Sequence, residues 1–515
     1  MYMQCNSGLV AFLICVLLTF VFLFYNQFEF DITFKSIMLM VEQKPSSFFE
    51  KVIVHFDLKG AAPKPHYIKE LLPFIKKLGF TEILMEYEDM FPYSFGLSVL
   101  RRKTAFDEMT TKQLKESANA IGLNIIPLIQ TFGHFEFALK HQEFSSLRED
   151  PNWMDTICPN NERSIWLIRE MISQIRHIHH DEKSIHIGCD EAYHIGLDKA
   201  CQLRLNTTLN GSIDRLKLEH ISRVARMAKE EFGFEQVLVW NDMFEKIPVA
   251  LLEEYKLGSL IVPVVWGYKT DVARPGYFPD GLFERFSQVF DNIYFAGAFK
   301  GADGISQQFV HIERYMQNLR SYQKLYHQNE MYLKDRLTGL ILTGWQRYSH
   351  TTPLCELLPA GIPSLARQAI FVSQWMNKRE ERTDQFMQEF LNCSVRHSTS
   401  ATKFVRKGFT FPFVFEFKFC DCQFPGVELY SEIEELNLLR WKAAIERYIS
   451  SNETEKETQN ELEKMEEEFR KLRKTIASLL GHFFYEDTVD EWLAQHDHLN
   501  RFNDDDLGLP PPNQL

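Results

Sequence analysis

The sequence predicts an α/β protein built on a closed (β/α)8 TIM barrel, with an N-terminal transmembrane helix and a mainly helical C-terminal region. Eight short apolar runs alternate with longer segments of helical period between about residues 50 and 365, which is the pattern of repeated βα units. The first run is followed by Asp57-Leu-Lys-Gly, which lacks the glycine-rich phosphate loop of a doubly wound open sheet. A barrel is therefore favoured over the open sheet.

The N-terminal prediction rests on residues 9–25, an apolar run without a charge or a proline that follows a short segment of residues 1–8. As a helix rising about 1.5 Å per residue, this run comes close to crossing a membrane core of about 30 Å. It ends in bulky residues rather than the small ones that precede a signal-peptide cleavage site. An uncleaved signal-anchor is thus expected, followed by a stem over residues 26–50; a cleaved signal peptide and a buried helix are the alternatives.

The barrel is expected to occupy residues 51–378. Its strands are predicted at residues 52–56, 82–86, 124–129, 184–188, 236–240, 260–266, 292–296 and 339–343. Amphipathic helices are predicted at residues 67–78, 112–121, 165–178, 216–232 and 312–326, with a last helix at 365–378. This number of βα units and this length suit the barrel fold.

A mainly helical region is predicted over residues 379–503. Long helices are expected at 432–450 and 455–480, the second rich in glutamate and lysine, as solvated helix faces are. Residues 504–515 contain three consecutive prolines and are predicted to form a disordered tail.

Composition excludes several classes of function. The net charge of −13 argues against a nucleic-acid-binding protein, because neutralising phosphates requires a basic surface. Seven cysteines follow the apolar N-terminal run, but Cys420 and Cys422 are separated by one residue only, and no second pair has zinc spacing. One or two disulfides are possible. No metal and no organic cofactor are expected, and the sequence does not specify an oligomeric state.

Four Asn-x-Ser/Thr triplets are candidates for N-glycosylation. They stand at Asn206, Asn210, Asn392 and Asn452. Together with the apolar N-terminus they predict a single-pass membrane protein with a lumenal catalytic domain, in the Golgi or another secretory compartment. The alternative is a secreted or lysosomal protein after signal cleavage.

Polar residues stand at the ends of the predicted strands, where the active sites of (β/α)8 enzymes are built. Lys59 and Glu88 follow the first and second strands, His134 follows the third, and the adjacent acids Asp190 and Glu191 follow the fourth. These side chains are therefore expected to converge on one site.

Aromatic residues mark the later strand ends. Trp240 and Asp242 follow the fifth strand, Trp266 and Tyr268 the sixth, and Trp345 the eighth. Indole rings can stack on the apolar face of a sugar, while carboxylates and amides can bind its hydroxyls. A single tryptophan is as readily a core residue, but three at corresponding positions favour a sugar-binding pocket.

The acids Asp190 and Glu191 point to the type of reaction. In a regular strand neighbouring side chains face opposite ways, so both can face a substrate only if the backbone turns at the strand end. Adjacent carboxylates are poorly placed to act from opposite sides of one glycosidic bond. They suit a division in which Glu191 protonates the leaving group and Asp190 orients a 2-acetamido nucleophile carried by the substrate. The alternative is that both acids cap the following helix.

The segment His186-Ile-Gly-Cys-Asp190-Glu191 resembles the signature of glycoside hydrolase family 20, the β-N-acetylhexosaminidases, and most closely that of its hexosaminidase D branch. Further matching stretches lie at residues 55–61, 86–93, 130–134, 298–301, 342–348 and 355–361. The resemblance implies an exo-β-N-acetylhexosaminidase that removes terminal β-linked GlcNAc and/or GalNAc from glycoconjugates by substrate-assisted retaining hydrolysis.

The resemblance also implies roles for the acids and for the residue that supports them. Glu191 would be the general acid/base, with a raised pKa, and Asp190 would stabilise the acetamido group. His134 would support this site. Lys59 stands near the position where lysosomal members carry a hydroxyl-binding arginine, so the preference between gluco and galacto substrates stays open.

Roles in sugar binding follow from the same resemblance. Trp240, Trp266 and Trp345 would form the aromatic walls of the site, and Tyr268 would bind the acetamido oxygen. Asp242 would take a sugar hydroxyl.

Three other functions are compatible with the sequence. A conventional two-carboxylate retaining glycosidase would use Glu86 or Glu88 opposite Glu191, and Glu88 is in any case expected to contact the substrate. A catalytically inactive, membrane-anchored glycan-binding barrel is the second alternative, and an interaction scaffold that uses the charged C-terminal helices is the third.

Overall fold

The computed structural model describes residues 48–376, 383–394, 403–406, 409–412, 419–450 and 455–499. The expected signal-anchor at residues 9–25, residues 26–47 of the stem and the tail at 504–515 lie outside these ranges, as does Asn452. Among the helices in the described ranges, none combines the length and the apolar character needed to cross a membrane. The anchor therefore stays a prediction.

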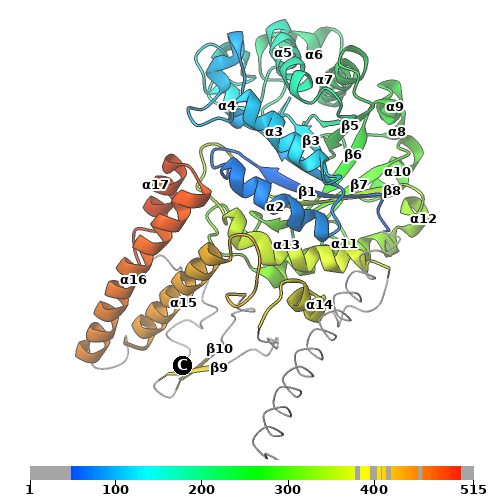
Figure 1. Ribbon diagram of the computed structural model, residues 1–515. Coiled ribbons are helices and arrows are strands. Elements are labelled where there is room, and N and C mark those ends of the chain that lie inside the picture. The colour runs from blue at the N-terminus through cyan, green and yellow to red at the C-terminus, as the bar shows by residue number, and fades with distance from the viewer. Residues whose placement is uncertain are drawn as a thin grey trace, which may run out of the picture. The chain divides into compact units, whose positions relative to one another are not determined.

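Eight parallel strands close into a barrel in sequence order (Figure 1). The strands are β1 Lys51–Asp57, β2 Glu82–Glu86, β3 Asn124–Leu128, β4 Ser184–His186, β5 Gln236–Trp240, β6 Val262–Trp266, β7 Ile293–Lys300 and β8 Leu337–Gly344. Strand β1 pairs with β2 on one side and with β8 on the other, which closes the ring. The predicted (β/α)8 barrel is confirmed, and each predicted strand overlaps an observed one.

Helices surround the barrel and connect its strands (Figure 1). They are α2 Pro65–Lys77, α3 Glu108–Asn119, α4 Glu136–Leu139, α5 Glu162–Ile178, α6 Lys199–Thr207, α7 Ile213–Arg226, α8 Val249–Glu254, α9 Leu257–Leu260, α10 Leu282–Val289, α11 Ile312–Gln328, α12 Glu330–Leu333 and α13 Leu358–Ser373. Short 3-10 turns stand at Glu88–Met90, Phe95–Leu100 and Ser145–Leu147. Helix α5 shows how the sequence specifies such an element, because Asn161 caps its first turn and every third or fourth residue is buried.

Two predicted helix boundaries differ from the structure. The helix expected at 216–232 ends as an α-helix at Arg226 and continues as a π-helical turn, Met227–Glu231. The helix expected at 365–378 is α13, which begins at Leu358 and ends at Ser373. Pro359 is tolerated there because the first turn of a helix has no internal partner for its backbone N–H group.

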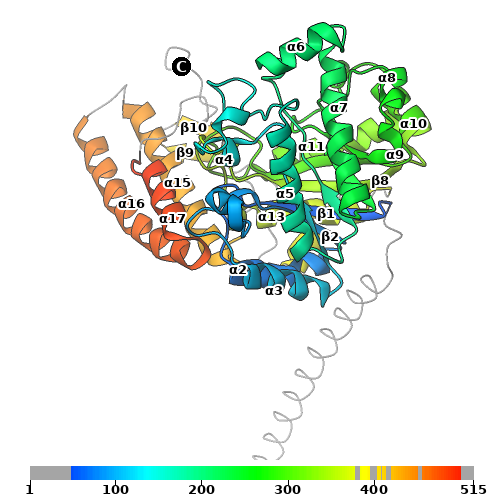
Figure 2. The same ribbon diagram turned by 90° about the horizontal axis from the view of Figure 1, so that it is seen from above.

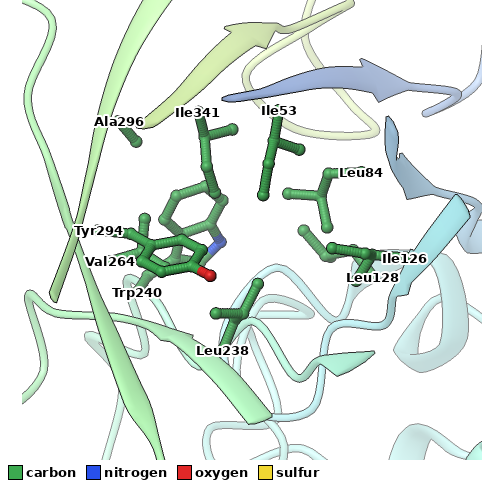
Figure 3. Packing of buried hydrophobic residues seen from close by; sticks show 10 residues of the cluster. All are labelled: Ile53, Leu84, Ile126, Leu128, Leu238, Trp240, Val264, Tyr294, Ala296 and Ile341. Carbon is green, nitrogen blue, oxygen red and sulfur yellow. The ribbon is translucent and has the colours of Figure 1, made fainter. Parts of the chain in front are cut away.

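The barrel interior is filled by inward-facing side chains from its strands (Figure 3). The buried cluster consists of Ile53, Leu84, Ile126, Leu128, Leu238, Trp240, Val264, Tyr294, Ala296 and Ile341. Trp266 and Trp345 are partly buried and pack against this cluster. The interior is thus a solid core, and the strand ends above it are left to form a site.

The C-terminal region is mainly helical, as predicted, and Figure 2 shows its two long helices, α15 and α16, side by side. It contains α14 Thr383–Phe390, β9 Lys403–Arg406, β10 Phe409–Pro412, α15 Val427–Ser450, α16 Glu455–Phe483 and α17 Glu486–Gln495. The antiparallel pair β9–β10 was not predicted. A disulfide joins Cys393 to Cys422. Phe484 forms an isolated antiparallel bridge with Pro63, so the end of α16 lies against the loop that follows β1.

Candidate active site

A turn of the backbone after β4 brings the two adjacent acids to the same side. Gly188, Cys189 and Glu191 have left-handed backbone conformations, with φ of 65°, 70° and 48°. They interrupt the alternation of a strand, so Asp190 and Glu191 line one pocket. A left-handed conformation costs a non-glycine residue about 1–3 kcal/mol and persists only where surrounding contacts hold it. The turn that the sequence requires at this strand end is present.

The pocket lies at the carboxyl ends of the strands. Its lining residues are Lys59, His134, Asp190, Glu191, Trp240, Trp266, Tyr268, Gly301, Ala302, Trp345, Arg347 and Tyr348. Eight of these are residues that the sequence predicts for the site, and they come from six different strand ends. The fold therefore gathers most of the predicted site in one place.

His134 lies between the two acids. Its Nε2 atom is 3.0 Å from Glu191 Oε2 and 3.5 Å from Asp190 Oδ2. Burial opposes a charge on the imidazole, but Asp190 and Glu191 outweigh it and raise the pKa of His134 to about 10. The loop can approach this closely because Gly133 has no side chain: a Cβ there would be 1.9 Å from the Asp190 carbonyl oxygen. His134 is thus a cation at neutral pH.

Glu191 is held through both carboxylate oxygens. Oε2 faces His134, and the hydroxyl of Tyr193 donates to Oε1 at 2.7 Å. Burial alone would raise the pKa of Glu191, but the hydrogen bonds from His134 and Tyr193 lower it below the ordinary value. The expectation of a raised pKa for Glu191 is therefore wrong, because the charged imidazole of His134 stabilises the carboxylate.

Asp190 has the opposite electrostatic environment. It is 6% exposed, and burial, followed by the negative charges of Asp242 and Glu191, raises its pKa to about 7 in spite of His134. Its Oδ1 atom is buried and has no hydrogen-bond partner among the described residues. Of the two acids, Asp190 is therefore the one that more readily carries a proton, and Oδ1 can accept a hydrogen bond from a ligand.

Aromatic rings form the floor and walls of the pocket. The ring centroids of Trp266 and Tyr268 are 5.3 Å apart, and Trp345 lies 6.3 Å from Tyr268 and 6.0 Å from Trp240. Trp240 is 1% exposed and belongs to the barrel core, so it forms the floor. Trp266 and Trp345 are half-buried and can present a ring face to a ligand.

Asp242 does not line the pocket. Its Oδ2 atom accepts the backbone N–H group of Glu191 at 2.9 Å, and its Oδ1 atom accepts the indole N–H group of Trp266 at 3.0 Å. Both oxygens thus accept hydrogen bonds from neighbouring residues, and the contact to a sugar hydroxyl expected for Asp242 stays a prediction.

Glu88 is also absent from the pocket lining, contrary to its expected contact with substrate. Its side chain is buried behind Lys59, whose Nζ atom lies 3.4 Å from Glu88 Oε1, and its other oxygen pairs with His350. Burial raises the pKa of Glu88 well above its ordinary value, and the negative charges of Glu86 and Asp57 add to the shift although Lys59 opposes it, so this buried carboxyl favours its neutral form.

Lys59, which lines the pocket, is also the centre of a buried ion cluster. Its Nζ atom lies 3.6 Å from Asp57 and 3.5 Å from Glu86, and 5.4 Å from the centre of the Trp345 ring. Burial would lower the pKa of Lys59, but Asp57, Glu86 and Glu88 raise it well above the ordinary value. Lys59 is therefore a permanent cation that holds Glu86 and Glu88 away from the substrate side.

Four lining residues were not predicted for the site, namely Gly301, Ala302, Arg347 and Tyr348. Tyr193 and Glu491, which contact Glu191 and Arg347, were not predicted either. Arg347 lines the pocket and donates to the carbonyl oxygen of Lys59 and to both oxygens of Glu491 on α17, at 3.0 and 2.7 Å. Arg347 lies within the stretch 342–348 that carries the family resemblance, and Tyr193 stands two residues after Glu191. Their positions in the sequence could therefore have suggested that both belong to the site. No such feature of the sequence pointed to Glu491.

Comparison with known proteins places this arrangement in a family. No protein-family profile matches the chain. Hexosaminidase D from Bos taurus is 38% identical over 338 residues, which are 65% of this chain and 96% of the bovine protein. The chain belongs to the hexosaminidase D family. This confirms the predicted enzyme class, a glycoside hydrolase of the β-N-acetylhexosaminidase type.

Two further comparisons are more partial. Human hexosaminidase D is 40% identical over 319 residues, so the match spans 62% of this chain and 64% of the human protein. The crystal structure of a β-N-acetylhexosaminidase from Bacteroides fragilis has 13% identity and a TM-score of 0.49, over 67% of this chain and 70% of that one.

Proposed function

We propose that this hexosaminidase is an exo-acting enzyme that removes terminal β-linked GlcNAc and/or GalNAc from glycoconjugates by substrate-assisted retaining hydrolysis. The observation that carries the proposal is that Asp190 and Glu191 share one aromatic-walled pocket on the same side of a strand end. Membership in the hexosaminidase D family supports the class of substrate.

In the first step, the free Oδ1 atom of Asp190 would accept the N–H group of the substrate's 2-acetamido group. This makes the acetamido oxygen more nucleophilic, so it attacks the anomeric carbon and an oxazolinium ion forms. Glu191 gives its proton to the leaving oxygen as the glycosidic bond breaks. Tyr268, which lines the same pocket, is the candidate for a hydrogen bond to the acetamido oxygen.

In the second step, Glu191 would take a proton from water, which opens the oxazolinium ion and retains the anomeric configuration. Glu191 must thus alternate between acid and base. Its pKa is low while the imidazolium of His134 faces it, at 3.0 Å. Asp190 Oδ2 is 3.5 Å from the same Nε2 atom. If Asp190 becomes ionised on substrate binding, the imidazolium N–H group would donate to Asp190 in place of Glu191. Glu191 would then become the stronger proton acceptor of the pair.

The conventional two-carboxylate mechanism is not favoured. It requires a second glutamate that reaches the substrate, but Glu86 and Glu88 do not line the pocket and both face Lys59. In the arrangement described, neither could attack an anomeric carbon.

Two inhibitors separate these mechanisms. A thiazoline that mimics the cyclised intermediate should inhibit strongly if the acetamido group participates. A fluorosugar that traps a glycosyl-enzyme on a glutamate would instead identify the conventional route and overturn the proposal. Paired aryl gluco and galacto N-acetyl-β-glycosides, assayed alongside, would define the preferred sugar. Binding of N-acetylhexosamine without release of product would identify a glycan-binding protein.

We further propose that the catalytic domain is lumenal and is anchored in the membrane by residues 9–25, in the Golgi or another compartment of the secretory pathway. Three of the four glycosylation candidates, Asn206, Asn210 and Asn392, are exposed, as glycan attachment requires. The alternative is a secreted or lysosomal protein released by signal cleavage.

A further inference from the structure

Three metal-ligating side chains meet in the interior, outside the pocket. The ligand atoms of Glu149, Cys158 and Cys201 all lie within 4.8 Å of one another, and all three residues are buried. Glu149 and Cys158 belong to the long connection between β3 and α5, and Cys201 lies on α6, after β4. Folding therefore brings together the connection after β3, which contains His134, and the connection after β4, which contains Glu191.

The separations of these atoms resemble those of ligands around a tetrahedral ion. The two sulfur atoms are 3.5 Å apart, and Cys201 Sγ is 3.4 Å from Glu149 Oε2. Asp198 Oδ1 lies 3.8 Å from Cys158 Sγ, on the N-terminal side of α6. With Zn–S distances of about 2.3 Å and Zn–O distances of about 2.0–2.2 Å, tetrahedral ligands stand roughly 3.5–3.8 Å apart. Glu149, Cys158 and Cys201 therefore already stand near zinc spacing, whereas Asp198 lies outside this set of mutually close ligand atoms and would have to move toward it.

The buried carboxyl group of Glu149 also has no cationic side chain beside it in the part of the chain that the structure describes. The residue is 1% exposed, and among the described residues no lysine, arginine or histidine forms an ion pair with it. Its Oε1 atom accepts the backbone N–H groups of Leu197 and Asp198, at 2.8 and 3.3 Å, which leaves Oε2 directed toward the thiols. Buried carboxylates without a charged partner are unfavourable, and metal coordination is one way in which proteins satisfy them.

A disulfide between Cys158 and Cys201 explains the cluster less well. It would draw the sulfur atoms from 3.5 Å to about 2.05 Å. It would also remove the thiol hydrogen that Cys201 can donate to Glu149 Oε2 and leave that buried oxygen without a donor. Zinc instead takes the same oxygen as a ligand.

We propose that Glu149, Cys158 and Cys201 bind a structural Zn²⁺ ion, with Asp198 as the fourth ligand. Two thiolates with carboxylate oxygens in a tetrahedral arrangement suit zinc, and binding releases the two thiol protons. This differs from the expectation that the chain binds no metal, because the ligands come from segments that are separate in the sequence. The proposal does not depend on the proposed catalytic mechanism.

The zinc site would fix the segment that follows the catalytic pair. Between the pair and α6, His194 binds Asp155 with an Nδ1–Oδ2 distance of 2.8 Å and stacks on Trp153 at 4.7 Å. The carbonyl oxygen of Asp155 in turn accepts the N–H group of Phe135, next to His134. Zinc would thus act through positioning of these loops and would take no part in the chemical step.

The test is metal analysis of the full chain, purified without a metal-affinity resin. We expect about one zinc per chain by mass spectrometry of the metal content, and its loss in Cys201→Ser and in Glu149→Gln. Cys420→Ser, which changes an exposed cysteine, is the matched control and should keep the zinc. A chelator should lower the melting temperature of the wild type and make Cys158 and Cys201 reactive toward an alkylating agent.

Several outcomes would overturn the zinc site. Absence of zinc from wild type whose thiols are free would do so, as would a Cys158–Cys201 disulfide found by peptide mass spectrometry. Zinc retained by Cys201→Ser would place the ion elsewhere. Should that variant fail to fold, the chelation and alkylation of the wild type decide the matter, because thiols that react equally before and after chelation are not zinc ligands.

Discussion

Asp190 and Glu191 are neighbours in the chain but have different electrostatic surroundings. Asp190 is buried and its pKa is raised to about 7, whereas Glu191 accepts hydrogen bonds from His134 and Tyr193 and its pKa is lowered. Below a pH of about 7 the pair therefore carries one proton, held mainly by Asp190. The proposed mechanism needs the same proton on Glu191. Substrate binding must therefore redistribute a proton that the site already holds.

Replacement of Glu191 tests the acid role. We expect Glu191→Gln to reduce kcat/KM for substrates with poor leaving groups by about 10²–10⁴-fold, the usual contribution of general acid catalysis. Aryl glycosides with activated leaving groups should lose less, because their departure needs little protonation. Steady-state kinetics on a series of leaving groups measures both effects. Equal losses across the series would argue against Glu191 as the acid.

Replacement of Asp190 should behave differently. We expect Asp190→Asn to impair all N-acetyl substrates, whatever the leaving group, because the acetamido oxygen displaces the leaving group from the anomeric carbon in each case. The same series of glycosides provides the measurement. A loss confined to poor leaving groups would show that Asp190, and not Glu191, acts as the general acid.

The pH dependence of activity follows from the charges of the pair. Above pH about 7 the shared proton is lost, both acids are ionised and no proton donor remains. At acidic pH, below the lowered pKa of Glu191, a second proton neutralises both acids. His134 stays charged throughout, since its pKa is about 10. We expect kcat/KM to fall as pH rises through about 7 and to peak on the acidic side.

The profile should be measured on a poor leaving group, with the melting temperature recorded at each pH so that unfolding is not mistaken for titration. Activity that stays constant from about pH 6 to about pH 9 would contradict the assigned charges.

At the scale of elements, two segments decide whether the site is complete. The turn after β4 presents the acids, and α17 supplies Glu491 to Arg347 at the pocket edge. The junction of α16 and α17 is attached to the barrel through Phe484, which is fully buried and bridges to Pro63. The C-terminal helices therefore contact both the barrel and the edge of the pocket.

Replacement of Phe484 tests the attachment of the C-terminal helices to the barrel. Truncation of a buried phenylalanine removes apolar contacts and leaves a cavity, so Phe484→Ala should lower the free energy of unfolding by about 3–5 kcal/mol. Denaturant unfolding measures this change. Lys474→Ala, at an exposed position on α16, is the control and should change stability little. Equal stability of Phe484→Ala and wild type would mean that the helices are not coupled to the barrel.

At the scale of the whole molecule, the compartment determines which glycans the enzyme meets. The proposed lumenal location predicts N-glycans on exposed asparagines. We expect peptide-N-glycosidase to increase the gel mobility of the full chain expressed in animal cells. Asn206→Gln, Asn210→Gln and Asn392→Gln should each remove part of that shift. A chain whose mobility is unchanged by the enzyme would contradict the lumenal location.

Much of the barrel could be predicted because the signals are local. Strand β5 and helix α5 are recognisable from the spacing of their own apolar residues, and strand ends follow directly from strands. Lys59, His134 and Trp345 could be predicted for the pocket for the same reason. The sequence did not predict that Asp242 and Glu88 lie outside the pocket lining, because the direction of each side chain depends on partners from other strands.

By itself, the sequence determined the barrel, the family and the identity of the acids at the end of β4, since each depends on short-range order along the chain. Only the tertiary structure decided how those acids are charged. The pKa of Glu191 depends on His134, 57 residues away, and Lys59 removes Glu86 and Glu88 from the pocket. The proposed zinc ligands and the contact between Glu491 and Arg347 likewise join distant segments. Electrostatic interactions depend on distance in space, and sequence spacing does not report that distance.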